Sequence, residues 1–111
     1  MTEWTLIGQI SDIPVRGSRV VETLDGPIAV FRASDDQIFA LDNRCPHKGG
    51  PLSEGIVSDH RVACPLHNWV IDLESGEAVA PDVGCAPPVP VRLDQDQIYL
   101  GRKSAKRRAN G

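Results

Sequence analysis

Two short segments of the sequence each place a cysteine and a histidine close together. One residue separates Cys45 from His47, and two residues separate Cys64 from His67. Thiolate sulfur and imidazole nitrogen are ligands that iron-sulfur clusters and zinc both accept. A structural zinc finger usually takes its cysteines from one segment and its histidines from another, whereas this chain mixes the two types in each. The four side chains predict a metal centre, and their types alone leave zinc and an iron-sulfur cluster open.

Both pairs lie in segments that contain proline or glycine, over residues 45–52 and 64–69. Gly49 and Gly50 permit backbone conformations and close approaches that a side chain would prevent. A backbone that wraps around a bound group does not follow a regular sheet, so both segments are predicted to be binding loops.

Short stretches of alternating apolar and polar residues occupy much of the remaining sequence. This alternation predicts strands over residues 4–10, 19–23, 28–32, 37–41, 60–63, 69–73, 89–93 and 97–100. Turn-forming residues separate several of them, at 25–27, 34–36, 74–76 and 94–96. No stretch keeps a helical period over three turns. The sequence therefore predicts an all-β fold, an antiparallel sandwich or small barrel, with the two Cys/His loops in a subdomain within residues 43–88.

Charge is distributed unevenly along the 111-residue chain, whose net charge is −3. Residues 102–111 carry five of the twelve basic side chains and no acidic one. Residues 1–101 therefore have 7 basic and 15 acidic side chains, and a net charge of −8. That acidic body argues against nucleic acid or an anionic membrane as a partner. We expect one folded domain over residues 1–101 and a basic, disordered tail over 102–111.

The cysteine count and the N-terminus indicate a compartment. Three cysteines are too few for a disulfide framework, which favours ligands or free thiols in a reducing environment. The first residues lack the pattern of a signal peptide, and no apolar run approaches the length of a membrane span. These features predict a soluble, cytoplasmic protein.

The ligand spacing, Cys45-x-His47 followed after sixteen residues by Cys64-x2-His67, resembles the Rieske 2Fe-2S signature. In that family two cysteines hold one iron and two histidines hold the other. The resemblance implies a Rieske-like domain and a Rieske-type 2Fe-2S cluster bound by all four residues. It also implies one-electron transfer, with no catalytic residues on this chain.

The sequence departs from the respiratory Rieske proteins, which carry an extra cysteine in each loop, joined as a disulfide. Gly50 and Leu66 stand where those cysteines would be expected, and Asn68 follows His67 in place of a serine. Fewer hydrogen bonds to sulfur imply a lower potential, near the lower end of the range of about −150 to +300 mV. The chain is therefore similar to the ferredoxin branch of the family.

Longer stretches resemble the small subunit of assimilatory NAD(P)H nitrite reductase, over residues 45–55, 63–69, 72–78 and 84–91. That resemblance implies an electron-transfer or accessory subunit of a cytoplasmic oxidoreductase. Its partner would be the large sirohaem and flavin subunit that reduces nitrite to ammonium in nitrate assimilation. The alternative is a free-standing Rieske ferredoxin that delivers electrons to a ring-hydroxylating oxygenase. A zinc-stapled β module is a third, non-redox alternative.

Three further residues, which lie outside the predicted ligand set, could contribute to the site or to the core. We expect Cys85 to be a small buried thiol in a proline-rich third loop, without binding the cluster. His60 lies in a polar turn with no second ligand at a useful spacing, so an exposed side chain outside the site is predicted. Trp69 is expected to pack in the core or to shield the cluster.

Overall fold

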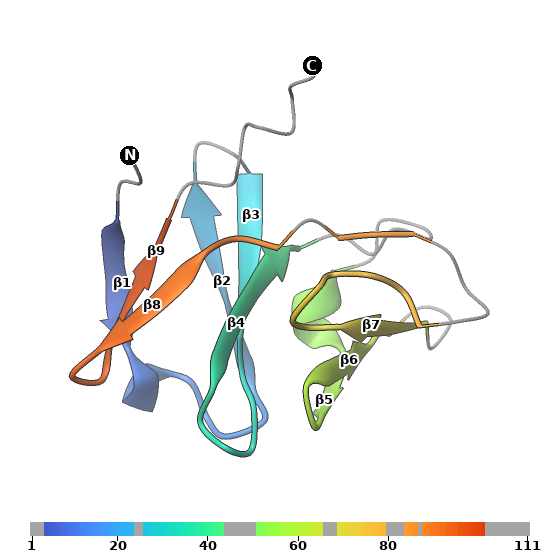
Figure 1. The fold of residues 1–111 in the computed structure, drawn as a ribbon, viewed down its shortest axis with the longest axis horizontal. Helices are drawn as coiled ribbons and strands as arrows, with labels where there is room; N and C mark the ends of the chain where they lie inside the picture. The colour runs from blue at the N-terminus through green and yellow to red at the C-terminus, as the bar shows by residue number, and fades with distance from the viewer. Residues whose placement is uncertain are drawn as a thin grey trace.

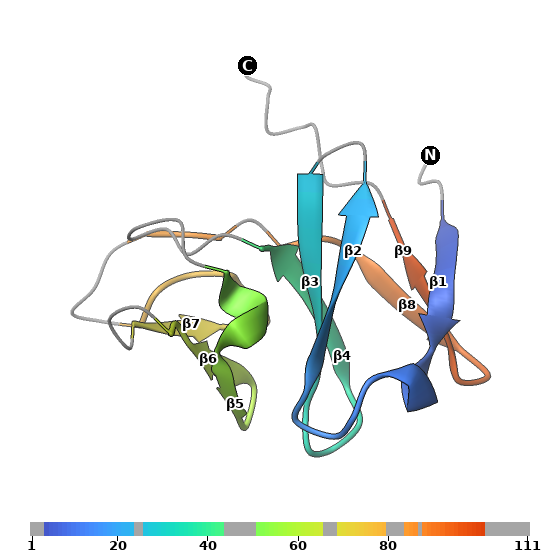
Figure 2. The same ribbon diagram turned by 180° about the vertical axis from the view of Figure 1, so that it is seen from behind.

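The structure, a computed structural model, describes residues 4–23, 26–43, 51–65, 69–79, 84–86 and 88–101. Over these ranges the regular elements are β-strands and two short 3-10 helices, and the strands form three antiparallel sheets of three strands each. Figures 1 and 2 show the three sheets side by side across the molecule. The prediction of an all-β, antiparallel fold is confirmed.

The middle sheet consists of consecutive strands in the order β2-β3-β4. Its members are β2 (Ser18–Thr23), β3 (Gly26–Arg32) and β4 (Ile38–Asp42). Branched and aromatic side chains give β3 a buried run from Ile28 to Phe31, as expected for a strand that is covered on both faces.

The terminal sheet brings the two ends of the described chain together, with β9 between β1 and β8. Its strands are β1 (Thr5–Gln9), β8 (Val91–Asp94) and β9 (Gln97–Leu100). The 3-10 helix η1 (Ile10–Asp12) follows β1. Gln95 and Asp96 both have positive φ in the two-residue connection between β8 and β9, which is the conformation of a type I′ hairpin turn.

The loop sheet is small and is formed by consecutive strands of three residues each. They are β5 (Ile56–Ser58), β6 (Arg61–Ala63) and β7 (Val70–Asp72), and the 3-10 helix η2 (Leu52–Glu54) precedes them. Seven of the eight predicted strands correspond in position to observed ones, and the eighth, 89–93, overlaps β8. The alternation did not predict β5, and the predicted turn over Gly26 and Pro27 is wrong, because these residues begin β3.

Two hydrophobic cores lie on opposite faces of the middle sheet. The terminal core is formed between the middle and terminal sheets by Ile13, Ile28, Val30, Ala40, Val89, Ile98 and Leu100. The loop core is formed between the middle and loop sheets by Ala29, Phe31, Leu41, Leu52, Val57, Val62, Cys64, Ile71, Leu73 and Ala86. Because side chains alternate along a strand, β3 supplies both cores.

Candidate functional site

Cys64 is the predicted ligand that lies among the described residues; Cys45, His47 and His67 lie outside them. Cys64 immediately follows β6, forms no disulfide and is 1% exposed in the loop core. Its surroundings are a protein interior, where a free cysteine behaves as a small apolar residue unless a metal binds its sulfur.

The predicted second loop is closed at its base by backbone pairing. Cys64 N–H donates to the Trp69 carbonyl oxygen at 2.7 Å, directly beyond the Ala63–Val70 pair that ends the β6–β7 ladder. The two ends of the segment that contains His67 are therefore held together, and residues 66–68 themselves lie outside the described residues. Trp69 packs against the loop core, as expected for a core residue.

The predicted first loop has a similarly fixed base. Asn43, the residue after β4, accepts a hydrogen bond on Oδ1 from Ser53 N–H at 2.8 Å, and its own N–H donates to the Pro27 carbonyl oxygen at 3.0 Å. Leu52, beside Ser53, is fully buried in the loop core. The segment that contains Cys45 and His47 thus begins at the middle sheet and ends at η2.

A third connection, residues 80–83, is closed by the strand-like pairing of its flanks. Ala78 N–H donates to the Gly84 carbonyl oxygen at 2.8 Å, and Ala86 N–H donates to the Gly76 carbonyl oxygen at 2.7 Å. Ala86 is buried in the loop core, and Ala78 packs against it. Residues from the bases of all three connections therefore meet in one core.

The expectation that Cys85 is a buried thiol is wrong, because its side chain is exposed. Cys85 pairs with Glu77 across the third connection. Loss of hydration raises the pKa of the Cys85 thiol, and the Glu77 carboxylate raises it further. The exposure of Cys85 contrasts with the burial of Cys64, the predicted ligand that the structure describes.

The site residues fit a thiolate-bound metal centre as far as the structure describes them. A buried cysteine without a disulfide stands at the base of a short loop, and thiolate sulfur is the donor that iron-sulfur clusters use. Within the described ranges no group of three or more histidine, cysteine or acidic side chains is placed to hold a metal ion. The four-residue ligand set thus stays a prediction.

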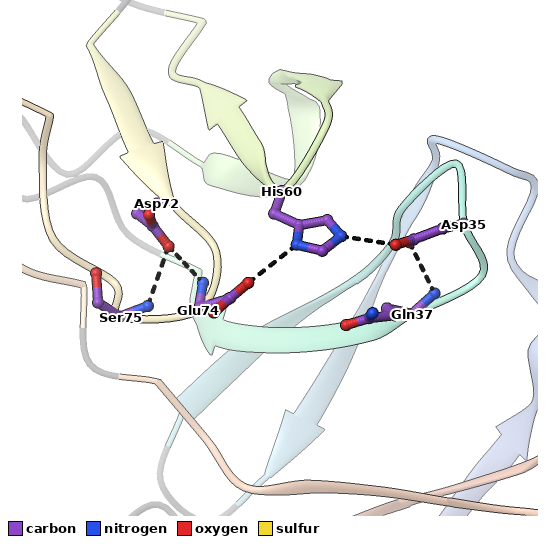
Figure 3. A network of polar contacts seen from close by, with 6 residues as sticks. All are labelled: Asp35, Gln37, His60, Asp72, Glu74 and Ser75. Carbon is purple, nitrogen blue, oxygen red and sulfur yellow. Dashed lines mark hydrogen bonds and ion pairs between the residues drawn. The ribbon is translucent and has the colours of Figure 1, made fainter.

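His60 is only partly exposed, whereas the sequence predicts an exposed side chain outside the site, and it belongs to a polar network (Figure 3). Its Nδ1 lies 3.0 Å from Glu74 Oε2 and its Nε2 lies 2.9 Å from Asp35 Oδ2. The hydrogen bond with Glu74, followed by that with Asp35, raises the pKa of His60 above its usual range. The bond with His60 is also the main reason why the pKa of Asp35 is lowered.

Among the residues that the structure describes, no helix is long and apolar enough to cross a membrane.

Comparison with known proteins gives one family match, to the Rieske [2Fe-2S] domain over residues 3–99. The anthranilate 1,2-dioxygenase ferredoxin subunit of Burkholderia cepacia is 38% identical over 106 residues, covering 90% of this chain and 93% of that protein. The 3-phenylpropionate/cinnamic acid dioxygenase ferredoxin subunit of Photorhabdus laumondii is 34% identical over 93 residues, covering 82% and 87%.

Other relatives are much longer than this chain. The oxygenase component of 3-ketosteroid-9-alpha-monooxygenase from Mycobacterium tuberculosis is 38% identical over 66 residues, which are 60% of this chain and 17% of that protein.

Among solved structures, a protein from Mycobacterium tuberculosis assigned as the small subunit of an NADH-dependent nitrite reductase superposes with a TM-score of 0.83. The sequence identity is 25%, and the match covers 92% of this chain and 96% of that one.

Proposed function

Because the chain belongs to the Rieske [2Fe-2S] domain family, we propose that it is a small electron carrier whose cluster is bound by Cys45, His47, Cys64 and His67. The family's cofactor is a [2Fe-2S] cluster, which supplies one-electron transfer when bound. The burial of Cys64 at the base of the second loop carries the ligand assignment, since it provides a thiol inside the protein with no disulfide partner.

The two ligand types have different roles in this proposal. Cys45 and Cys64 supply thiolate charge and soft sulfur donors, whereas His47 and His67 supply neutral imidazoles. Replacing two thiolates by imidazoles removes negative charge from the site and raises its reduction potential above that of an all-cysteine ferredoxin. No residue of this chain is proposed to act on a substrate.

We propose further that the chain is a ferredoxin that delivers electrons to a ring-hydroxylating oxygenase. The observation that favours this role is the 38% identity to a dioxygenase ferredoxin subunit over nearly the full length of both chains. A second dioxygenase ferredoxin is 34% identical over most of its length. The relatives thus favour the ferredoxin alternative over the nitrite reductase subunit that the longer motifs suggest.

The nitrite reductase small subunit is the second candidate. It is supported by the motif stretches over residues 45–55 and 72–78 and by the superposition on a protein assigned to that class. In this role the partner is a large sirohaem and flavin subunit, and the chain supports nitrite reduction in nitrate assimilation. Both candidates place the protein in the cytoplasm.

Purification of the cluster-loaded chain with its partners from the source cell distinguishes the two roles. A ferredoxin is expected to support NAD(P)H-dependent oxygen consumption by the copurified oxygenase, only when an aromatic substrate is present and only when this chain is added back. If NAD(P)H oxidation instead depends on nitrite and on this chain, the second candidate is correct and the oxygenase role is wrong.

A further inference from the structure

His60 stands where the loop sheet meets the middle sheet. It occupies the two-residue connection between β5 and β6, next to the Ser58–Arg61 pair. Glu74 follows β7 and belongs to the same side of the junction, whereas Asp35 lies in the turn between β3 and β4. One ring nitrogen therefore contacts the loop-sheet side at 3.0 Å, and the other reaches across to the middle sheet at 2.9 Å.

The two partners determine which protonation state of the ring fits. Ionised carboxylates accept hydrogen bonds and have none to donate, so each ring nitrogen must carry a proton to bond its partner. Only the imidazolium has two N–H donors. A neutral ring would turn one nitrogen lone pair towards a carboxylate oxygen, which replaces an attraction by a repulsion.

Neighbouring hydrogen bonds fix the backbone of the turn that carries Glu74 and hold the Asp35 carboxylate (Figure 3). Asp72 Oδ1 accepts bonds from Glu74 N–H at 2.8 Å and Ser75 N–H at 3.2 Å, which shapes the turn that carries Glu74. Asp35 Oδ1 accepts a bond from Gln37 N–H at 3.3 Å. Both partners of His60 therefore belong to turns whose backbone is fixed by hydrogen bonds on either side of the junction.

The remaining surroundings favour a positive charge at this position. Asp59 and Asp72 line the hollow beside His60, and Arg61 is the basic residue that faces it. The Phe39 ring of β4 packs against the imidazole, with ring centroids 5.0 Å apart and planes at 55°. The His60 side chain is 30% exposed, so solvent can exchange its proton while its neighbours hold its orientation.

We propose that His60 is a pH-responsive latch, which as an imidazolium ties the loop sheet to the β3–β4 turn and releases that tie when it loses its proton. Other side-chain bonds between described residues cross the same junction. Arg16 Nε donates to the Val57 carbonyl oxygen at 3.4 Å, Ser18 Oγ donates to the Ser53 carbonyl oxygen, and Asn43 Oδ1 accepts from Ser53 N–H at 2.8 Å. Guanidinium, hydroxyl and amide groups keep their protonation state near neutral pH, so among these contacts the one made by His60 responds to pH there.

The direction of the pH effect follows from the His60 pKa, which is raised by its bonds to Glu74 and Asp35. A raised pKa means that the folded protein binds the proton more tightly than the unfolded chain. The stabilisation is complete below the unfolded pKa of about 6.5 and is lost as the pH rises through the folded value. We therefore expect the junction to be firm in mildly acidic solution and looser in alkaline solution.

Hydrogen exchange of the cluster-loaded protein tests the latch at about pH 6 and about pH 9, which lie below and above the ordinary histidine pKa of about 6.5. His60→Gln is compared with the wild type at the same pH, so that the chemical rate of exchange cancels. We expect amides of β6 and β7 to exchange faster in His60→Gln at about pH 6, by less than about tenfold because the pair is partly exposed. At about pH 9 the two proteins should exchange alike.

Asp59→Asn is the matched control, because it removes a carboxylate from the same turn without removing a bonded partner of His60. Because Asp59 only lines the hollow beside His60, its loss should shift the dependence on pH less than the loss of the bonded Glu74 carboxylate does. If His60→Gln does not fold, Glu74→Gln retains the histidine and should lower the imidazole pKa measured by NMR titration. An unchanged pKa in that variant, or an equal effect of His60→Gln at both pH values, would overturn the proposal.

Discussion

On one face of the middle sheet the chain forms a sheet of four- and five-residue strands, whereas on the other it forms a sheet of three-residue strands bordered by long connections. The terminal core consists entirely of aliphatic side chains. The loop core also contains a cysteine and residues from the bases of three connections. The same strand, β3, supplies both cores through alternate side chains.

This difference indicates how the molecule divides stability and function. Sheets of very short strands are not stable by themselves and need packing against other elements. The loop sheet packs against β3 and β4, and a bound metal centre would stabilise it further. We therefore expect the loop sheet to depend on the cofactor and the terminal sheet to be independent of it.

Replacement of Cys64 by serine should have the largest effect. A hydroxyl is a much weaker ligand for an iron-sulfur cluster than a thiolate, so we expect Cys64→Ser to lose the visible absorption of the cluster. Hydrogen exchange should then accelerate in β6 and β7 while β3 and β9 remain protected. Metal analysis and exchange measured on the same sample check both parts.

Cys85→Ser is the control for that experiment, since Cys85 is exposed and is not among the proposed ligands. It should keep its iron, its sulfide and its visible spectrum. Retention of the spectrum in Cys64→Ser would remove Cys64 from the ligand set. Equal loss of protection in β6 and β9 would show instead that the two halves depend on the cofactor alike.

Phe31→Ala should be the next largest change. The ring is fully buried in the loop core, and truncation of a buried phenylalanine typically costs about 3–5 kcal/mol. We expect a loss of that size in the free energy of unfolding measured with urea, together with faster release of the cluster.

Ile28→Val is the control, because it alters the opposite face of the same strand. It should lower the free energy of unfolding by about 0.5–1.5 kcal/mol and leave cluster release unchanged. Faster release in Ile28→Val than in Phe31→Ala would contradict the assignment of the two faces.

The strand pattern of the fold could be predicted because alternation is a local property. The run from Ile28 to Phe31 and the turn at Gln95 and Asp96 both follow from residues close in sequence. The β5 strand could not be predicted in this way, because Ile56 and Val57 are both apolar and so hide the alternation, although Ile56 is exposed and Val57 is buried. The pairing of strands into sheets could not be predicted either, because it depends on contacts between residues far apart in sequence, as between β1 and β9.

The type of site could be predicted from the sequence, but the contacts of individual residues could not. Ligand types and spacing pointed to a Rieske centre, and the family match confirms the cluster, whereas the individual ligands stay a prediction. His60 was missed because its partners Glu74 and Asp35 lie 14 and 25 residues away, each in a separate turn. Turn sequences identify where the chain reverses, but they do not tell which turns meet.

Two glycines with positive φ offer a smaller test of the same comparison. Gly26 begins β3 with φ +99° and has open space where a Cβ would stand, whereas Gly76, beside the third connection, has φ +77° and would place a Cβ against the Ala86 carbonyl oxygen. An alanine at either position carries a conformational cost of about 1–2 kcal/mol. The added clash should bring Gly76→Ala to about 2–4 kcal/mol, because backbone atoms must move.

Urea denaturation of the two alanine variants measures the difference in their free energies of unfolding. The rate of cluster release shows whether the loop core is disturbed. Gly76→Ala should release the cluster faster than the wild type, because Gly76 pairs with Ala86, a residue of the loop core. Gly26→Ala should lose stability with less effect on release, since a Cβ at Gly26 would meet open space and would displace no backbone of the loop core. If both variants lose the same free energy of unfolding and release the cluster at the same rate, close backbone packing at Gly76 does not support the site.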